Sequence, residues 1–361
     1  MARFHELEIA EIRRETADAV TVRFALPDEL KPEFAYRQGQ HLILKAELDG
    51  EELRRTYSIC SGVQDQELRI CVKRQPGGRF SAFAHEVLQP GHRVLAMSPS
   101  GRFFVPLDPA AARSHMAFCA GSGITPIFSI LKSVLAVEPR SHFTLVYGSR
   151  DTASIIFREE LEDLKDRHLT RFALYHVLSR EEQDLPILNG RIDAAKVRAF
   201  ARAVIDPLSV DACYLCGPAP MIGEAARALE AEGVAKERIH FEYFTTQGNE
   251  PRPKLAPETA PTAAPAAGAC RVTAILDGRR TEFRMDRDGP SILDAARAAG
   301  ADAPYACKAG VCSTCRARIA EGSARMETNW ALEDWEVDAG FVLTCQSHPL
   351  TDRLVVDYDA S

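Results

Sequence analysis

Four cysteines in the last quarter of the chain have the spacing of iron–sulfur ligands. Cys307, Cys312 and Cys315 follow the pattern Cys-x4-Cys-x2-Cys, and Cys345 stands alone further along the sequence. Plant-type [2Fe–2S] clusters are held by thiolates at this spacing. A structural zinc site is the alternative, but such sites usually combine two short Cys-x2-4-Cys pairs. The isolated fourth cysteine therefore favours a [2Fe–2S] cluster, which carries one electron at a time.

Two strand-to-helix turns in the middle of the chain are typical of nucleotide-binding sites. Gly121-Ser-Gly123 follows an apolar run and is followed by Thr125 and Pro126. Glycines at such a turn let the backbone approach a pyrophosphate, which then faces the N-terminus of the next helix. Cys216-Gly-Pro-Ala-Pro-Met221 also ends a strand and begins a helix. A thiol there would lie beside a bound nicotinamide, and the alternative is a buried cysteine at a capping turn.

Two segments nearer the N-terminus combine residues suited to a flavin. Arg55-Thr-Tyr-Ser58 places a cation, a flat aromatic ring and a hydroxyl within four residues of one strand. Arg55 could hold a phosphate, Tyr57 could lie against an isoalloxazine ring, and Ser58 could hydrogen-bond its redox nitrogen. Gly77-Gly-Arg-Phe-Ser81 enters a helix and forms a second potential anion site. Taken singly, such segments are more often structural.

The elements that position these motifs fall into two patterns before residue 245. Short alternating strands indicate an antiparallel β-barrel, interrupted by one helix near 80–88; the strands are expected at 20–24, 41–48, 68–72 and 93–97. Strands then alternate with helices, which predicts a doubly wound parallel α/β sheet. Its strands are expected at 115–119, 143–147, 171–178 and 212–216, with a helix at 126–137.

A proline- and alanine-rich segment separates these parts from the cysteine motif. Prolines recur through residues 248–268, which predicts a semi-rigid linker. A hairpin of strands at 271–276 and 281–285, turned at Asp277-Gly278, and a helix at 292–299 follow. They indicate a small α+β ferredoxin-like (β-grasp) domain. The chain is thus predicted to be multidomain; the expected parts are a FAD-binding barrel at 1–108, an NAD(P)-binding domain at 109–247, the linker at 248–268 and the ferredoxin domain at 269–361.

Composition narrows the class of protein and its partners. The chain has 361 residues and a net charge of -7, which argues against nucleic acid as a partner. No apolar run is long enough for a transmembrane helix, and the N-terminal residues lack a signal core, so a cytoplasmic location without membrane contact is expected. Five further cysteines occur in apolar strand-like runs and are expected to be buried as small hydrophobic residues; they are Cys60, Cys71, Cys119, Cys213 and Cys270.

In their order along the chain, these motifs resemble a known family. The sequence is similar to ferredoxin–NADP reductase-type flavoproteins fused to a C-terminal plant-type ferredoxin. The matching elements are Arg55-x-Tyr57-Ser58, Gly78-x-x-Ser81, Gly121-x-Gly123-x-x-Pro126, Cys216-Gly-Pro-x-x-Met221 and the four cysteines. The resemblance covers essentially the whole chain. It is strongest to the reductase components of bacterial phenylacetyl-CoA epoxidases, which have this domain order and a similar ending at 340–350.

The resemblance implies an electron path and the residues that serve it. A flavin must stand between a nicotinamide, which gives up a hydride, and a cluster that accepts single electrons. By the family pattern FAD is held by Arg55, Tyr57, Ser58, Lys73, Gly78 and Ser81. The nicotinamide cofactor contacts Gly121, Gly123, Thr125, Cys216 and Met221. Glu242 and Phe244 lie near the flavin, and Ser58, Cys216 and Glu242 are the catalytic candidates.

The choice of nicotinamide depends on charge near the ribose. An acid suits a free 2′-hydroxyl, whereas arginine suits a 2′-phosphate. Ser179-Arg180 resembles the phosphate-binding pair of NADP-specific members and favours NADPH. Glu181 and Glu182 follow directly and weaken that signal, so NADH stays possible, and a solvated charged turn is the structural alternative.

The electron acceptor is the last part of the predicted electron path. The resemblance implies an oxygenase component, first a di-iron phenylacetyl-CoA epoxidase in aerobic phenylacetate degradation. The alternatives are another oxygenase, such as a Rieske-type or quaternary-amine hydroxylase, or a flavin diaphorase with a structural zinc module. An acidic cluster before Cys345 either steers a charged partner or is only a solvated helix face; it comprises Glu333, Asp334, Glu336 and Asp338.

Overall fold

The computed structural model describes residues 3–204, 206–244 and 268–360. Residues 5–244 form one compact unit, and the described residues from Gly268 onward belong to a second. Most of the predicted linker at 248–268 lies outside the described residues. No helix within the described ranges is long and apolar enough to cross a bilayer.

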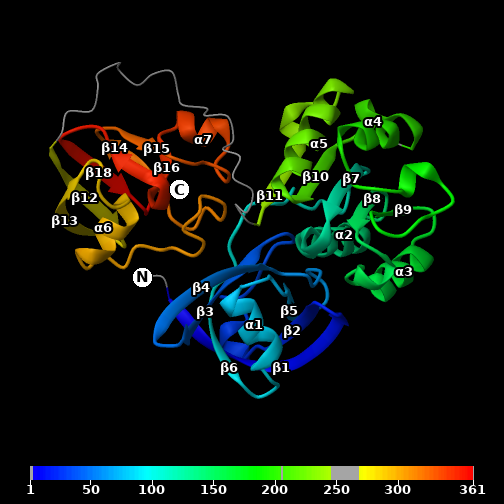
Figure 1. Cartoon of the computed structure of the whole chain (residues 1–361), viewed down its shortest axis with the longest axis horizontal. Coiled ribbons are helices and arrows are strands. Elements are labelled where there is room, and N and C mark those ends of the chain that lie inside the picture. The colour runs from blue at the N-terminus through cyan, green and yellow to red at the C-terminus, as the bar shows by residue number, and fades with distance from the viewer. Residues whose placement is uncertain (1–2, 205, 245–267, 361) are drawn as a thin grey trace. The chain divides into compact units, whose positions relative to one another are not determined.

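The N-terminal part is a curled antiparallel sheet with the strand order β4-β3-β6-β1-β2-β5 (Figure 1). Its strands are β1 (Phe4–Thr16), β2 (Ala19–Ala25), β3 (His41–Leu48), β4 (Glu51–Ser58), β5 (Leu68–Lys73) and β6 (Arg93–Met97). An antiparallel bridge between Ile59 and Ile70 joins the two outer strands, β4 and β5, so the sheet closes as a barrel. Apolar side chains at alternate positions fill it, and helix α1 (Arg79–Glu86) contributes the buried Phe80.

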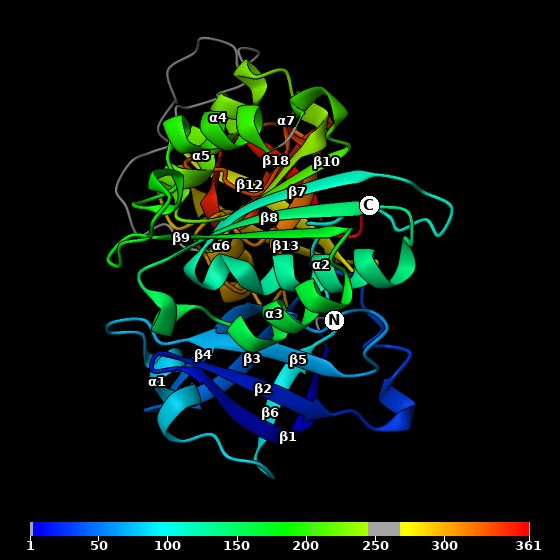
Figure 2. The same ribbon diagram turned by 90° about the vertical axis from the view of Figure 1, so that its right-hand side faces the viewer.

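The middle part is a parallel sheet with the strand order β11-β10-β7-β8-β9. Its strands are β7 (Ser114–Ala120), β8 (His142–Ser149), β9 (Phe172–Leu178), β10 (Ala212–Gly217) and β11 (Ile239–Tyr243). Helices α2 (Ile124–Val137) and α3 (Arg158–Arg167) cover one face, and α4 (Ala194–Ala203) and α5 (Ala219–Ala231) cover the other (Figure 2). Both faces are therefore buried, as a parallel sheet requires.

The C-terminal unit is a five-stranded mixed sheet with the order β13-β12-β18-β14-β16. Its strands are β12 (Ala269–Leu276), β13 (Arg279–Asp286), β14 (Arg316–Glu321), β16 (Phe341–Leu343) and β18 (Arg353–Asp357). Two short strands, β15 (Ala324–Met326) and β17 (Ser347–Pro349), pair separately, and the helices are α6 (Ile292–Ala298) and α7 (Asp334–Asp338). Asp277 and Gly278 both have positive φ, the geometry of a tight type I′ hairpin turn.

The predicted barrel, parallel sheet and α+β unit are all confirmed, with small differences at element ends. Helix α2 begins at Ile124 instead of 126, because Pro126 lies in the first turn, where no backbone donor is needed. Helix α1 ends at Glu86 instead of 88. The long first strand β1 and the last parallel strand β11 were missed. All five cysteines expected in the core are buried.

Candidate functional site

The two predicted nucleotide turns lie side by side at one edge of the parallel sheet. Strand β7 pairs with β10 in parallel, with Cys119 opposite Cys216. The chain runs outward from β7 to β8 and β9 on one side, and to β10 and β11 on the other. The carboxyl ends of β7 and β10 therefore flank the point where the strand order reverses. Ligands bind at this position in open α/β sheets.

Close packing at this switch point requires glycine. A Cβ atom added to Gly123 would lie 2.2 Å from the carbonyl oxygen of Cys216. Gly121 has φ +57°, and its carbonyl accepts a hydrogen bond of 3.0 Å from the Tyr147 hydroxyl. The buried Thr125 hydroxyl donates to the Ser122 carbonyl at 2.5 Å. The turn is thus held by its own side chains, with the backbone left as the surface a nucleotide could approach.

The Cys216 thiol is fully buried on the face of the sheet covered by α2. Burial raises its pKa well above the ordinary value, so the sulfur stays protonated. Met221 is also buried, and its Cε would lie 2.8 Å from a Cβ added to Gly217. Both residues lie beside the switch point, but the thiol is packed into the core and not exposed.

Glu242 brings the barrel and the parallel sheet together at the site. It lies opposite Cys216 in the pairing of β10 with β11. The Ser58 hydroxyl of β4 donates to its Oε2 at 3.3 Å, and Nδ1 of the buried His41 lies 3.7 Å from its Oε1. His41 and Ser58 are register partners in β3 and β4, and the other ring nitrogen of His41 is 3.2 Å from the Ser100 hydroxyl.

His41 is not among the site residues predicted from the sequence. The residue begins an apolar run and looked like an ordinary strand residue. Only the register of β3 with β4 places it beside Ser58, and only the fold brings Glu242 to both. Ser58 and Glu242, predicted separately, are brought into contact although they are 184 positions apart.

The remaining flavin candidates lie on the barrel strands and on α1. Arg55 is exposed, with its guanidinium donating to the Arg54 carbonyl at 2.8 Å, and half-buried Tyr57 packs against Phe80. Lys73 Nζ lies 3.6 Å from the position of a Cβ added to Gly121, which puts this barrel cation next to the nucleotide turn.

The glycine turn before α1 is tied together by a buried serine. The Ser81 hydroxyl donates to the carbonyl of Gly78, the N-cap residue of α1, at 2.9 Å and accepts from the Gln75 N–H at 3.1 Å. A Cβ added to Gly78 would lie 2.6 Å from that hydroxyl. Ser81 therefore shapes the turn and has its hydrogen bonds within the protein.

Ser179 and Arg180 follow β9 and are exposed. Their backbone N–H groups donate to the carbonyls of Ser149 and Arg150 at 3.0 and 2.7 Å, which extends the pairing of β9 with the segment after β8. Phe244 packs against the core of the parallel sheet beyond β11. These residues border the same carboxyl edge of the sheet, with Arg180 on the β9 side.

The four predicted cluster ligands approach one another as two pairs. Cys312 hydrogen-bonds to Cys307 and lowers the pKa of the Cys307 thiol to about 6. A hydrogen bond from Cys315 likewise lowers the pKa of the Cys345 thiol. A binuclear cluster takes two cysteines for each iron, so this arrangement suits two irons. Among the described residues, no three His, Cys, Asp or Glu side chains gather around a position for a single metal ion.

Further donors surround the sulfur atoms. The Ala309 N–H donates to Cys307 Sγ at 3.3 Å, and the Thr314 hydroxyl lies 3.1 Å from Cys312 Sγ. Hydrogen bonds to thiolate sulfur are a principal means by which a protein sets a cluster potential. The loop therefore fits the iron–sulfur group that the spacing predicts.

One acid of the predicted acidic cluster does not belong to a surface. Glu336 is fully buried, and its carboxylate accepts from Arg316 Nε at 2.7 Å. The Arg316 guanidinium lies over the Phe341 ring, 3.4 Å from its centroid. Both interpretations of the cluster, steering patch and solvated helix face, are therefore wrong for this residue, since an internal ion pair explains its charge.

Three domain families match the chain in the order of its three parts. Residues 6–105 match the oxidoreductase FAD-binding domain, and residues 118–227 match the oxidoreductase NAD-binding domain. Residues 274–350 match the 2Fe-2S iron-sulfur cluster binding domain. FAD, a nicotinamide cofactor and a [2Fe–2S] cluster are thus the groups that the chain is built to hold.

Relatives match over nearly the full length. The chain is 43% identical over 362 residues to a component protein of the 1,2-phenylacetyl-CoA epoxidase of Escherichia coli (strain K12), covering 100% of this chain and 99% of that protein. It is 33% identical over 354 residues to the ferredoxin reductase component of 3-ketosteroid-9-alpha-monooxygenase of Rhodococcus rhodochrous, covering 98% and 96%. Among solved structures, phthalate dioxygenase reductase matches in fold with a TM-score of 0.59 at 22% identity, covering 98% of each chain.

Proposed function

The chain belongs to the family of FAD- and NAD-binding reductases with a C-terminal [2Fe–2S] ferredoxin domain, and we propose that it delivers electrons to a di-iron phenylacetyl-CoA epoxidase. The observation that carries this proposal is the full-length match to an epoxidase component, at higher identity than the match to the 3-ketosteroid monooxygenase component. The inferred physiological role is aerobic phenylacetate degradation, with NADPH as the electron donor.

We assign the residues of the site by their place around the switch point. The backbone of Gly121 and Gly123 admits the pyrophosphate of the nicotinamide cofactor, while Thr125 and Met221 fix the adjoining turns. Arg55, Tyr57, Lys73, Gly78 and Ser81 hold FAD along the barrel. When bound there, FAD would supply the chemistry that links a two-electron hydride donor to a one-electron centre.

Proton handling falls to Glu242 and its partners. A hydride brings one proton with its two electrons, whereas the cluster accepts electrons only, so one proton must leave the site for each pair of electrons passed on. Glu242 accepts from the Ser58 hydroxyl and lies beside His41, so it can take up that proton through Ser58. The neutral, buried Cys216 contributes apolar packing next to the position assigned to the nicotinamide.

The electron path is tested by removing one cluster ligand. Cys312→Ala should abolish reduction of a one-electron protein acceptor, yet it should spare NADPH-driven reduction of ferricyanide, because hydride transfer precedes the cluster. The purified wild-type chain should contain FAD, two irons and two labile sulfides. Stoichiometric zinc without labile sulfide would instead identify the third part as a structural module of a diaphorase.

Another oxygenase partner is the second candidate. The relation to a 3-ketosteroid monooxygenase component supports it, since similar reductases serve different oxygenases. Reconstitution with the purified epoxidase and, separately, with a Rieske-type hydroxylase should give substrate-coupled NADPH consumption only with the epoxidase. NADPH consumption coupled only to the hydroxylase would make that oxygenase the acceptor and would contradict the epoxidase assignment.

We also propose the domain boundaries and the location of the protein. The barrel part is assigned to 1–108, because β6 ends at Met97 and β7 begins at Ser114, and the nucleotide part is assigned to 109–247, which includes β11 (Ile239–Tyr243). The linker is assigned to 248–268 and the ferredoxin part to 269–361. A cytoplasmic location is supported by buried thiols in the described residues, which suit a reducing compartment.

A further inference from the structure

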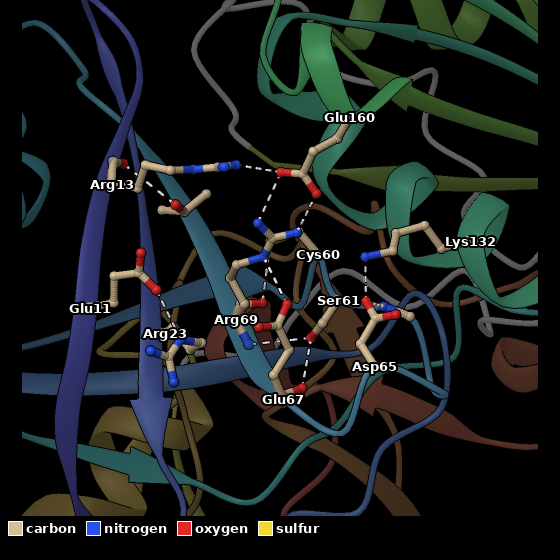
Figure 3. Close-up of polar contacts among 12 residues, drawn as sticks. Glu11, Arg13, Arg23, Cys60, Ser61, Asp65, Glu67, Arg69, Lys132 and Glu160 are labelled. Atoms are coloured by element: carbon tan, nitrogen blue, oxygen red, sulfur yellow. Dashed lines mark hydrogen bonds and ion pairs between the residues drawn. The ribbon is translucent and has the colours of Figure 1, made fainter. Parts of the chain in front are cut away.

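A two-point ion pair joins the parallel sheet to the barrel, away from the switch point. Glu160 on α3 accepts from Arg69 on β5 at 3.0 Å and 2.8 Å, one bond to each carboxylate oxygen (Figure 3). The Arg69 side chain is 10% exposed and that of Glu160 is 25% exposed. This fork geometry fixes direction as well as distance, because both planar groups must align.

Further charges around Arg69 balance the pair. Arg13 on β1 also contacts Glu160, and Glu67 lies 3.2 Å from Arg69 Nε. The Phe157 ring lies under the Arg69 guanidinium, 5.8 Å from its centroid. Two cations and two carboxylates thus meet in a half-buried cluster that includes residues of β1, β5 and α3.

The segment that carries Glu160 is held firmly on its own side. Phe157, which precedes α3, has φ +60° and ψ +28°, a left-handed conformation that is costly for a bulky residue. Its buried ring stacks on Phe128 of α2, with centroids 4.5 Å apart. The first turn of α3 is therefore anchored to α2, the helix that begins at the nucleotide turn.

Helix α2 makes its own polar contacts with the barrel. The Ser129 hydroxyl donates to the Ser61 carbonyl at 2.7 Å, and the Ser133 hydroxyl accepts from the Val63 N–H at 3.0 Å. Lys132 forms an ion pair with Asp65 (Figure 3). Contacts from α2 and α3 to the barrel thus include directional polar bonds beside a shared apolar cluster, and these bonds tolerate little rotation of one part against the other.

We propose that Arg69 and Glu160 are positioning residues for hydride transfer. The nicotinamide side of the site is built on the parallel sheet and the flavin side on the barrel, so their separation depends on the angle between these parts. Reacting atoms must come within about 3–3.5 Å, and a misplacement of about 1 Å can cost roughly a hundredfold in rate. The inference rests on the hydride step of the proposed function and not on the identity of the acceptor.

The test compares rate with affinity in a double-mutant cycle. The variants are Arg69→Gln, Glu160→Gln and the double variant, with Glu162→Gln as the control. Glu162 lies on the same helix, and its ion pair among the described residues is with Arg158, at 3.1 Å. Flavin reduction by NADPH is followed by anaerobic stopped-flow absorption at saturating cofactor, with NADPH deuterated at the transferred position as a second substrate.

Glu160→Gln should lower the limiting rate constant by roughly tenfold to a hundredfold. The dissociation constant for NADPH should change less than about threefold, because neither residue is among those assigned to hold the cofactor, and the isotope effect should increase. The double variant should be no slower than the slower single variant, since each change already removes the contact that Arg69 and Glu160 share. FAD content, the cluster spectrum and the control should match the wild-type protein.

A wild-type rate constant in Glu160→Gln would overturn the proposal. So would a loss that follows FAD content with an unchanged isotope effect, because that pattern reports partial unfolding. Should Glu160→Gln not fold, Glu160→Asp keeps the charge on a shorter side chain. The same split between rate and affinity in that variant supports the positioning role, and wild-type kinetics contradicts it. Because flavin reduction is followed without any electron acceptor, these outcomes are independent of the epoxidase assignment.

Discussion

At the end of β9, the Arg180 side chain stands beside a glutamate whose oxygens are already engaged. The Glu181 carboxylate accepts from the Thr152 N–H at 2.7 Å and from its hydroxyl at 2.6 Å. Within the described ranges, no carboxylate pairs with the exposed Arg180 guanidinium. The cation is thus available for a 2′-phosphate, whereas Glu181, one of the two acids that weakened the sequence signal, is occupied by Thr152.

Replacing Arg180 should separate the two nicotinamide cofactors. A charge-assisted contact to the 2′-phosphate contributes about 1.5–3 kcal/mol, so Arg180→Ala should raise the KM for NADPH by roughly tenfold to a hundredfold. The KM for NADH should barely change, because NADH has no phosphate at that position. Steady-state kinetics with both cofactors decides this. An equal rise in KM for NADPH and NADH would show that Arg180 has a structural role. A wild-type protein that prefers NADH would contradict the assignment of Arg180 to the 2′-phosphate.

Glu242 provides the most direct test of proton handling. Glu242→Gln keeps the shape of the side chain but removes the proton acceptor next to Ser58. Turnover with a one-electron protein acceptor should slow by roughly a hundredfold, a typical contribution of a positioned acid or base. FAD content should be unchanged. Turnover at the wild-type rate would show that the proton leaves by another route.

His176 on β9 should make stability depend on pH. Neither ring nitrogen has a hydrogen-bond partner among the described residues, and burial lowers the pKa of the ring to about 4, from 6.5. The unfolded chain therefore binds a proton at His176 more readily than the folded chain does. The contribution of neutral His176 to the free energy of unfolding is fully present above pH 6.5 and is lost as the pH falls towards 4. In denaturant unfolding at several pH values, the free energy of unfolding of His176→Leu should fall less steeply over this pH range than that of the wild-type protein. Parallel curves for variant and wild type would refute the claim.

At the scale of elements, the turn after β7 can approach β10 closely because Gly123 has no side chain. Gly123 has an ordinary helical conformation, so only space forbids a larger residue. Gly123→Ala should force the two turns apart and destabilise the nucleotide part by about 1–3 kcal/mol, the usual cost of overpacking. The midpoint temperature of thermal unfolding and the affinity for NADPH should both decrease.

A matched glycine gives the opposite expectation. A Cβ added to Gly223, inside α5, would meet only the end of the Arg227 side chain, at 3.5 Å. Gly223→Ala should therefore raise stability slightly, by about 0.5–1 kcal/mol, as in other helix interiors. If both variants behaved alike, the close approach of Gly123 to Cys216 would not be the cause.

Local patterns predicted most elements but few of the contacts between them. Alternation and apolar runs identify strands such as β3 and β6, whose ends agree with prediction, because period and burial are local properties. The pair Arg69 and Glu160 spans 91 positions, and no spacing rule connects such residues. Glu336 was expected at the surface with the other acids, because its partner Arg316 comes from a distant element, strand β14. Ion pairs between elements depend on register and packing, which a single sequence does not display.

At the scale of the whole molecule, three parts correspond to three steps of electron transfer. Residues 5–244 bring the nicotinamide and flavin sides together in one compact unit. The two cysteine pairs belong to the second unit. Each step thus has its own structural part, and the central claim is that electrons pass through them in the order NADPH, FAD and [2Fe–2S].

Anaerobic reduction of the purified chain by NADPH, followed by absorption and electron paramagnetic resonance, tests that claim most directly. Bleaching of the flavin should come first, and the paramagnetic signal of a reduced [2Fe–2S] cluster should then grow as one electron passes to it. Cys312→Ala should show the bleaching without the signal. A fully reduced flavin beside a cluster that stays oxidised in the wild-type chain would contradict the account.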